Sequence, residues 1–138
     1  MTTTAGSKST WVDALHNPKS VEALYSRAPE FVECLRVALD REGPRIDLIG
    51  ILDRFPDNPP RKWKDAGSNV AVITLRIEGL SKLTVVSWTT SNRGSLSLTR
   101  EADNRIAFAF QNESGPLITG TGLVVHVAEF GHYFDPSM

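Results

Sequence analysis

Residues 31–53, FVECLRVALD-REGP-RIDLIGILD, decide the fold. Every second residue from Leu35 to Leu39 is apolar and faces one side, while residues 34, 36 and 38 face the other, which is the period of a β-strand. Residues 41–44 are turn residues, and the alternation then resumes with Ile46 and Leu48 on either side of Asp47. The stretch therefore predicts a β-hairpin with one apolar face.

The chain that follows this hairpin continues the strand pattern. Runs with a period of two begin near residues 69, 83, 95, 106 and 117, and short turns such as 91–94 and 101–104 separate them. Parallel strands need connections of about a dozen residues or more, so we expect antiparallel pairing. The last run, residues 117–130, is predicted to be one long strand that bends at Gly120 and Gly122. Residues 55–68 contain three prolines and predict a long loop, a kind of segment that is often functional.

The chain that precedes the hairpin predicts one helix. Asn17 is a good N-cap, Pro18 suits the first helical position, and Pro29 ends the helix, which gives residues 17–27. The expected fold class is α+β, with an antiparallel, largely meandering sheet of about seven strands and this N-terminal helix packed on it. Residues 1–10 are predicted to be a disordered tail and residues 11–138 a single domain. The expected core residues are Leu35, Val37, Ile46, Leu48, Ile73, Leu75, Val85, Leu98, Phe108 and Val125.

Composition excludes several classes of protein. The 138 residues are 41% hydrophobic and 22% charged, with a formal net charge of −1, which is typical of one globular domain and argues against a strongly basic nucleic-acid binder. Cys34 is the only cysteine, so no disulfide can form within the chain and a reducing, cytoplasmic location is expected. No stretch approaches the roughly 20 apolar residues of a membrane helix, so we expect no membrane partner.

No group of residues predicts catalysis or metal binding. His126 and His132 would stand about 20 Å apart on an extended strand, too far to share a metal ion. Cys34 is expected to fill the core as a small apolar residue rather than to act as a nucleophile. The Gly120-Thr121-Gly122 segment lacks the third glycine and the helix of a dinucleotide-binding loop. We therefore expect no catalytic residue, no metal and no cofactor.

Residues 61–64, Arg-Lys-Trp-Lys, form the most suggestive cluster in the chain. Three cations around a tryptophan are typical of a surface that contacts nucleic acid or an acidic protein, and tryptophan and arginine are common at protein interfaces. In the alternative interpretation, Trp63 folds back to close one end of the core while the cations remain in solvent.

Three segments together resemble the Immunity protein 50 family of bacterial polymorphic-toxin systems: GPRIDL (residues 43–48), DRFPDNPPRKW (53–63) and NVAVITL (69–75). The opening around Trp11 and Asn17-Pro18, and the stretch from Gly79 to Trp88, look like the same family, so the resemblance spans residues 11–100. It implies an immunity protein that binds and neutralises a cognate toxin domain inside the cell, without catalysis.

The resemblance and the loop together suggest where the toxin would bind. The candidate contacts are Asp57, Arg61, Lys62, Trp63 and Lys64, on a loop whose prolines lower the entropy lost on binding. Two alternatives stay open. One is a small ligand-binding or enzymatic β-rich domain that uses the concave face of the sheet. The other is a homodimer, or larger homo-oligomer, whose exposed sheet edge pairs with a second copy.

Overall fold

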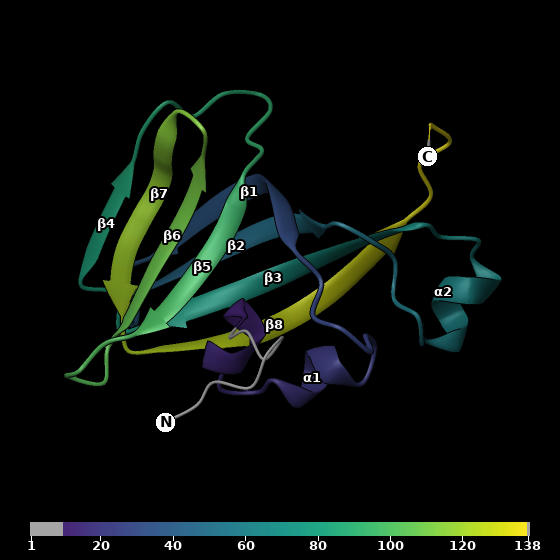
Figure 1. The fold of residues 1–138 in the computed structure, drawn as a ribbon, viewed down its shortest axis with the longest axis horizontal. Coiled ribbons are helices and arrows are strands. Elements are labelled where there is room, and N and C mark those ends of the chain that lie inside the picture. Colours follow the sequence, from purple (N-terminus) through teal and green to yellow (C-terminus); the bar gives the residue numbers. More distant parts are fainter. Residues whose placement is uncertain (1–9, 138) are drawn as a thin grey trace, which may run out of the picture.

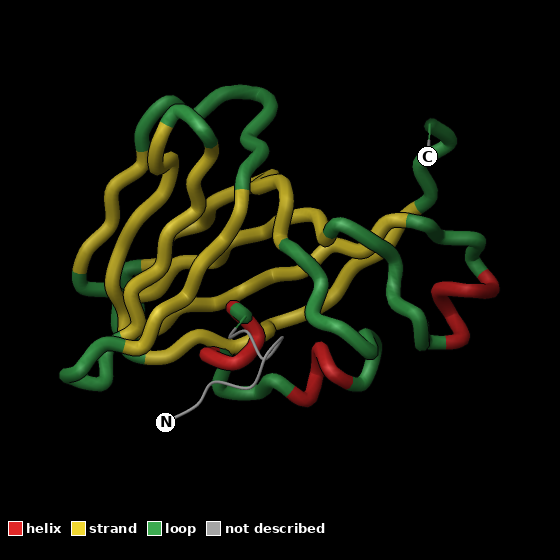
Figure 2. Tube along the Cα trace, viewed as in Figure 1, coloured by secondary structure: helices red, strands yellow, loops and turns green. Residues whose placement is uncertain are grey.

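Two four-stranded antiparallel sheets make up the computed structural model, which describes residues 10–137. Sheet A contains, in spatial order, β1 (Phe31–Asp40), β2 (Arg45–Leu52), β3 (Val70–Glu78) and β8 (Val124–Tyr133). Sheet B contains, in spatial order, β4 (Lys82–Val85), β7 (Gly115–Gly122), β6 (Ile106–Asn112) and β5 (Ser95–Arg100). The helical segments are short: η1 (Trp11–Ala14), α1 (Lys19–Glu22) and α2 (Arg61–Asp65). Sheet B faces one half of sheet A, which continues toward α2 at the other end (Figures 1 and 2).

The core lies between the two sheets. Side chains of both sheets form one buried cluster, in which the rings of Phe31 and Phe110 meet edge to face at 5.7 Å. The predicted hairpin is confirmed as β1 and β2, which pair without a register shift from Arg36 to Asp40. Seven of the predicted core residues are confirmed as buried: Ile46, Leu48, Ile73, Leu75, Leu98, Phe108 and Val125.

Two of the expected core residues are not buried. Leu35 is 46% exposed and Val85 is 40% exposed, while Val37 is partly buried against the core. A register shift between Cys34 and Arg36 turns the Cys34 side chain inward, so Cys34 takes the buried position. The period-two pattern identifies a face of a strand, but it does not show whether another layer covers that face.

A bent two-stranded ribbon connects the sheets. β3 pairs with β8 in sheet A, and the same two chain segments continue into sheet B as β4 and β7. At the corner Gly79 has φ +69°, and the Leu123 N–H donates to the Glu78 carbonyl at 2.8 Å. The predicted long strand over 117–130 is therefore two strands, and its bend falls at the end of β7, beside Gly122.

The prediction of one meandering sheet of about seven strands is wrong. Eight strands are present in residues 10–137. The chain passes from sheet A to sheet B after β3 and returns to sheet A between β7 and β8, and an isolated antiparallel bridge between Glu33 and Arg93 also joins β1 to the segment before β5. β3 and β4 therefore have neighbours, β8 and β7, that lie far along the sequence. Local periodicity cannot reveal such pairings, because turn lengths constrain only strands that follow one another.

The predicted helix over residues 17–27 is also wrong, since only the four residues of α1 are helical in that range. The Asn17 side chain does not cap the helix. Its amide nitrogen donates to the Val127 carbonyl at 3.2 Å, and its oxygen accepts from the Val127 N–H at 2.9 Å. Just beyond α1, the Asn58 side chain donates to the Ala23 carbonyl at 3.0 Å. So short a helix has little stability of its own. Contacts with distant residues therefore fix the conformation of this segment, and the helix does not extend further.

The predicted tail lies almost wholly outside the described residues, which begin at Thr10. The Thr10 hydroxyl accepts from the Val12 N–H, and the Asp13 carboxylate accepts from the Thr10 N–H, which forms a capping box at η1.

Candidate functional site

The predicted loop between β2 and β3 contains a short helix, α2, at the end of sheet A (Figure 1). Pro60 precedes the helix, and its carbonyl accepts the N–H of Trp63 at 3.0 Å. Gly67, with φ +71°, ends it, and the Ser68 N–H then returns to the Trp63 carbonyl at 3.1 Å. Proline before the helix and a left-handed glycine after it fix where this single turn begins and ends.

Trp63 fixes α2 to the body of the protein. Its side chain is 7% exposed and stacks on the His132 ring, with centroids 4.9 Å apart. Phe55 lies 5.8 Å and Phe130 6.1 Å from the same indole. The Ser68 hydroxyl and the His132 Nδ1 are 2.7 Å apart, which orients the histidine ring. Trp63 therefore closes one end of the core.

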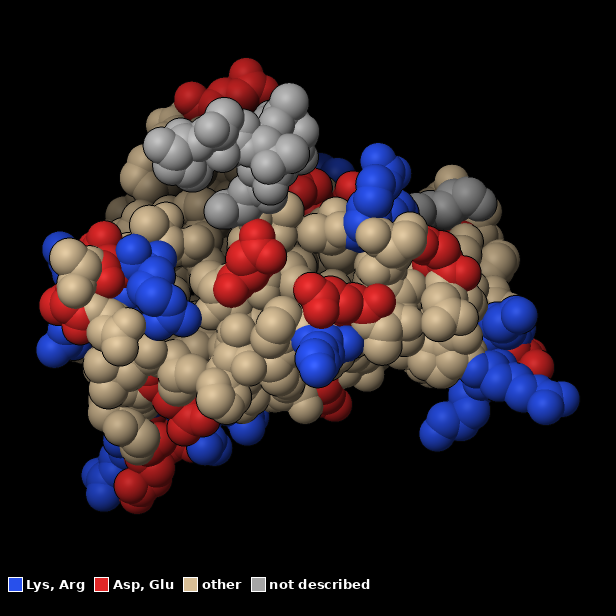
Figure 3. Space-filling model, turned by 60° about the horizontal axis from the view of Figure 1, so that its bottom comes forward, with Lys and Arg blue, Asp and Glu red and all other residues tan. Residues whose placement is uncertain are grey.

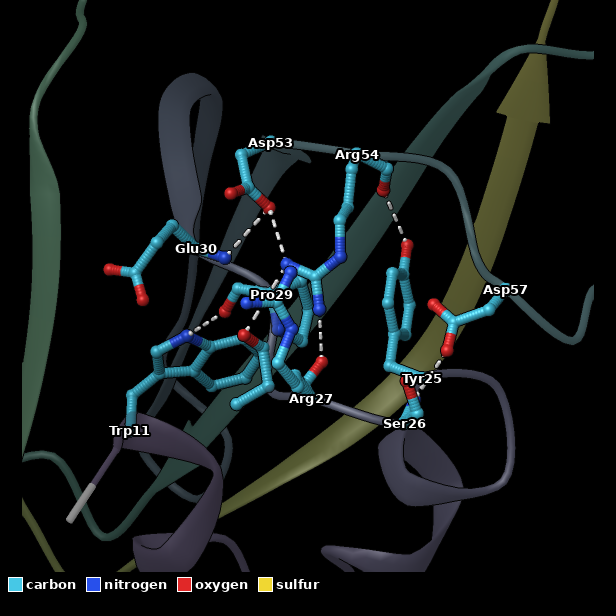
Figure 4. A network of polar contacts seen from close by, with 10 residues as sticks. Trp11, Tyr25, Ser26, Arg27, Pro29, Glu30, Asp53, Arg54 and Asp57 are labelled. Carbon is cyan, nitrogen blue, oxygen red and sulfur yellow. Dashed lines mark hydrogen bonds and ion pairs between the residues drawn. The ribbon is translucent and has the colours of Figure 1, made fainter. Parts of the chain in front are cut away.

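Arg54 holds the N-terminal segment onto the start of the same loop (Figure 4). Its guanidinium donates to the carbonyls of Arg27 and Ala28, pairs with Asp53 at 3.4 Å, and lies 5.4 Å from the centre of the Tyr25 ring. The Tyr25 hydroxyl donates to the Arg54 carbonyl at 2.8 Å. We call this arrangement the Arg54 clamp.

Asp57 extends the clamp toward α2. Its carboxylate accepts the Ser26 N–H at 2.8 Å (Figure 4). Hydrogen bonds from the Ser26 side chain and backbone hold the pKa of this carboxyl below its usual range. The Asp57 carboxylate, predicted as a toxin contact, thus already accepts a hydrogen bond from Ser26 within the chain.

The cations of α2 point away from the protein. The Arg61 side chain is 93% exposed, and its one ion pair among the described residues, with Asp65 at 3.8 Å, is a weak surface contact. Lys62 and Lys64 are exposed, and neither has an ion pair within residues 10–137. Figure 3 shows Lys and Arg side chains projecting from this end of the molecule, at the right.

Two aromatic residues at the C-terminal end of β8 were not predicted as part of the site. Tyr133 is 41% and Phe134 is 61% exposed. The Tyr133 carbonyl accepts the Asn69 N–H at 3.0 Å, and the Asn69 side chain makes two hydrogen bonds to the backbone of Asp135. These bonds tie the aromatic pair to the segment that follows α2. Two adjacent aromatic residues near the end of the chain are visible in the sequence, but only the pairing of β3 with β8 shows that they lie next to the segment that follows α2.

The two histidines of β8 and the cysteine of β1 occupy three separate places in the structure. His126 lies 3.7 Å from the Glu78 carboxylate on β3, while His132 belongs to the Trp63 cluster. Burial raises the pKa of the Cys34 thiol to about 11, which disfavours the nucleophilic thiolate. Within residues 10–137, no three His, Cys, Asp or Glu side chains gather closely enough to hold a metal ion. Among the same residues, no helix is long and apolar enough to cross a membrane.

A second exposed feature lies where the two sheets separate. A groove of about 510 Å³ runs between β1 and the segment after β4, lined by Leu35, Arg36, Val37, Val85 and Trp88. Its lining is mainly apolar, and among the described residues that line it Arg36 is the only ionisable one. The groove thus offers a surface for apolar contact, and its lining does not provide the pair of acidic and basic groups that acid–base catalysis requires.

Comparison with known proteins identifies the family. The model of one family, Immunity protein 50, matches residues 17–129, which is most of the chain and includes the Arg54 clamp, α2 and the first part of β8. Searches of curated proteins and of solved structures each find no match. The chain therefore belongs to the Immunity protein 50 family and is a toxin immunity protein of a polymorphic toxin system, a kind of protein that is typically not an enzyme.

Proposed function

We propose that this immunity protein neutralises its toxin in the cytoplasm by binding it directly, and that the α2 end is the docking surface. We define the α2 end as the exposed side chains Arg61, Lys62, Lys64, Tyr133 and Phe134. The observation that carries the proposal is the presentation of the three cations on a helix that Trp63 fixes to the core. A surface held rigid in this way loses little conformational entropy on binding.

The composition of the α2 end determines the partner that it fits. Cations without strong partners favour an acidic patch on the toxin and speed the encounter with it. The exposed aromatic rings at the end of β8, on the segment that Asn69 ties to the chain after α2, supply apolar contact area, as at many protein interfaces. Trp63 and Asp57 have a different role in this proposal: they position α2 and the loop before it, because both are engaged within the chain.

Charge reversal at α2 tests the proposal. The probe is the cognate toxin domain, and titration calorimetry measures its affinity for the double variant Arg61→Glu/Lys64→Glu. We expect the dissociation constant to rise by at least about tenfold, which corresponds to about 1.4 kcal/mol. The association rate should fall most at low salt, because the lost interaction is long-range attraction.

The matched control makes the same change in charge elsewhere. Lys82 on β4 and Arg100 on β5 are exposed cations of sheet B, so Lys82→Glu/Arg100→Glu alters the net charge equally. Both double variants should unfold at nearly the wild-type temperature, since exposed charges contribute little to stability. If the two variants weaken toxin binding equally, or neither does, the α2 end is not the docking surface.

A further inference from the structure

The outer edge of β1 changes character along its length. At its start it is paired on both sides, because the Cys34 N–H donates to the Asn92 carbonyl at 2.9 Å and the Gly94 N–H donates to the Val32 carbonyl at 3.0 Å. From residue 36 onward, β1 is the outermost strand of sheet A. Residues 36–40 therefore form a strand edge that has no hydrogen-bonded neighbour on its outer side among the described residues.

The inner face of this edge is apolar and only partly covered. Val37 lies opposite Leu48 and Leu39 opposite Ile46, so both point to the face on which Leu48 and Ile46 are buried. Nevertheless Leu39 is 63% exposed. The exposed residues Leu35, Val85 and Trp88 continue this apolar surface along the groove between the sheets.

We propose that this edge pairs with the same edge of a second copy of the chain. An antiparallel pairing centred on Ala38 places Val37 of each copy opposite Leu39 of the other, on the apolar face. On the opposite face, it places Arg36 of each copy opposite Asp40 of the other. Side chains that face each other across antiparallel strands lie about 5 Å apart at Cβ, within reach of an ion pair. A single two-fold axis at Ala38 therefore forms two apolar contacts on one face and two ion pairs on the other.

The charges on the edge favour this occupant over others. Arg36 has no carboxylate within ion-pair distance in residues 10–137, and Asp40 is partly exposed beside Arg45, its partner at 3.2 Å. A two-fold interface requires a surface that is complementary to itself, and residues 36–40 satisfy this requirement. The edge of β4 does not, because Lys82 is its one charged residue and pairing β4 with itself supplies no carboxylate.

The dimer leaves the α2 ends free. β1 and β2 join through residues 41–44 at one end of sheet A, whereas α2 lies in the connection from β2 to β3 at the other end. Pairing near residue 38 therefore does not cover α2. The dimer and the toxin-docking proposal are independent, and either can fail without the other.

Sedimentation equilibrium of the full chain tests the dimer. We expect a concentration-dependent species of twice the 15.2 kDa mass of one chain. Arg36→Glu alone and Asp40→Arg alone should each weaken the dimer by at least about tenfold, because each places like charges opposite one another twice. An equimolar mixture of these two variants should restore the dimer, since the carboxylate introduced into one variant then faces the guanidinium introduced into the other.

Two further variants serve as a control and as a test of the apolar face. Arg61→Glu reverses an exposed cation at the opposite end of sheet A and should leave the dimer unchanged. Leu39→Lys places a charge on the apolar face and should give a folded monomer, as judged by circular dichroism. The proposal is overturned if the wild type sediments as a monomer at all concentrations, even if Leu39→Lys then weakens toxin binding. A dimer that persists in both single charge variants, or a mixture that stays monomeric, also overturns it.

Discussion

Replacing Trp63 by alanine tests whether the last residue of the segment 53–63, one of those that resemble the family, supports the fold. The indole is 7% exposed and packs against Phe55, Phe130 and His132. Removing a buried Trp or Phe side chain typically costs about 3–5 kcal/mol. The neighbours Phe55 and Phe130 are themselves only partly buried, so the site can partly collapse. We therefore expect a loss near the lower limit, about 3 kcal/mol.

Urea denaturation followed by far-UV circular dichroism measures this loss without relying on tryptophan fluorescence. A loss of this size in a chain of 138 residues lowers the melting temperature by about 10 °C. The control Trp63→Phe keeps an aromatic ring at the site and should cost about 1 kcal/mol. A loss below about 1 kcal/mol for Trp63→Ala would refute the conclusion that this residue closes the core.

Three other predictions concern the clamp, the corner between the sheets and the response to acid. Arg54→Met should destabilise the protein by about 2 kcal/mol in the same urea assay, because it leaves carbonyl groups of the N-terminal segment without their donor. Gly79→Ala should lower the melting temperature more than Gly67→Ala: both have positive φ, but only at Gly79 would the new Cβ lie within 3 Å of a side chain. Hydrogen bonds from Arg76 hold the pKa of Asp47 below its usual range, so unfolding free energy should fall as pH drops from about 4 through that lowered pKa, and Asp47→Asn should flatten this dependence in acid titrations monitored by circular dichroism.

The sequence predicts individual strands better than their arrangement. The alternation around Ile46, Leu48 and Ile73 identifies buried faces correctly, because these side chains point into the core between the two sheets. The same pattern places Leu35 and Val85 in the core, although both are exposed. These two lie where the sheets separate, and the separation depends on pairings between distant strands that no local pattern contains.

The site shows a similar division. The cations of α2 could be recognised from composition alone, because charged side chains on a proline-rich loop are expected to remain in solvent. The position of Trp63 could not be decided in this way, since its contacts with Phe130 and His132 come from a strand more than sixty residues away. The failed helix prediction has the same origin, because residue 58 bonds the backbone that a longer helix would use.

Hydrogen–deuterium exchange of the chain, free and bound to its cognate toxin domain, tests the central claim most directly. Backbone amides covered by a partner exchange more slowly, so the measurement locates the docking surface without altering a residue. We predict slower exchange in residues 61–66 and 133–135 of the complex, with little change in β4 and β5. Unchanged exchange in both residues 61–66 and residues 133–135, together with protection elsewhere on the protein, would contradict the assignment of the α2 end as the toxin-binding surface.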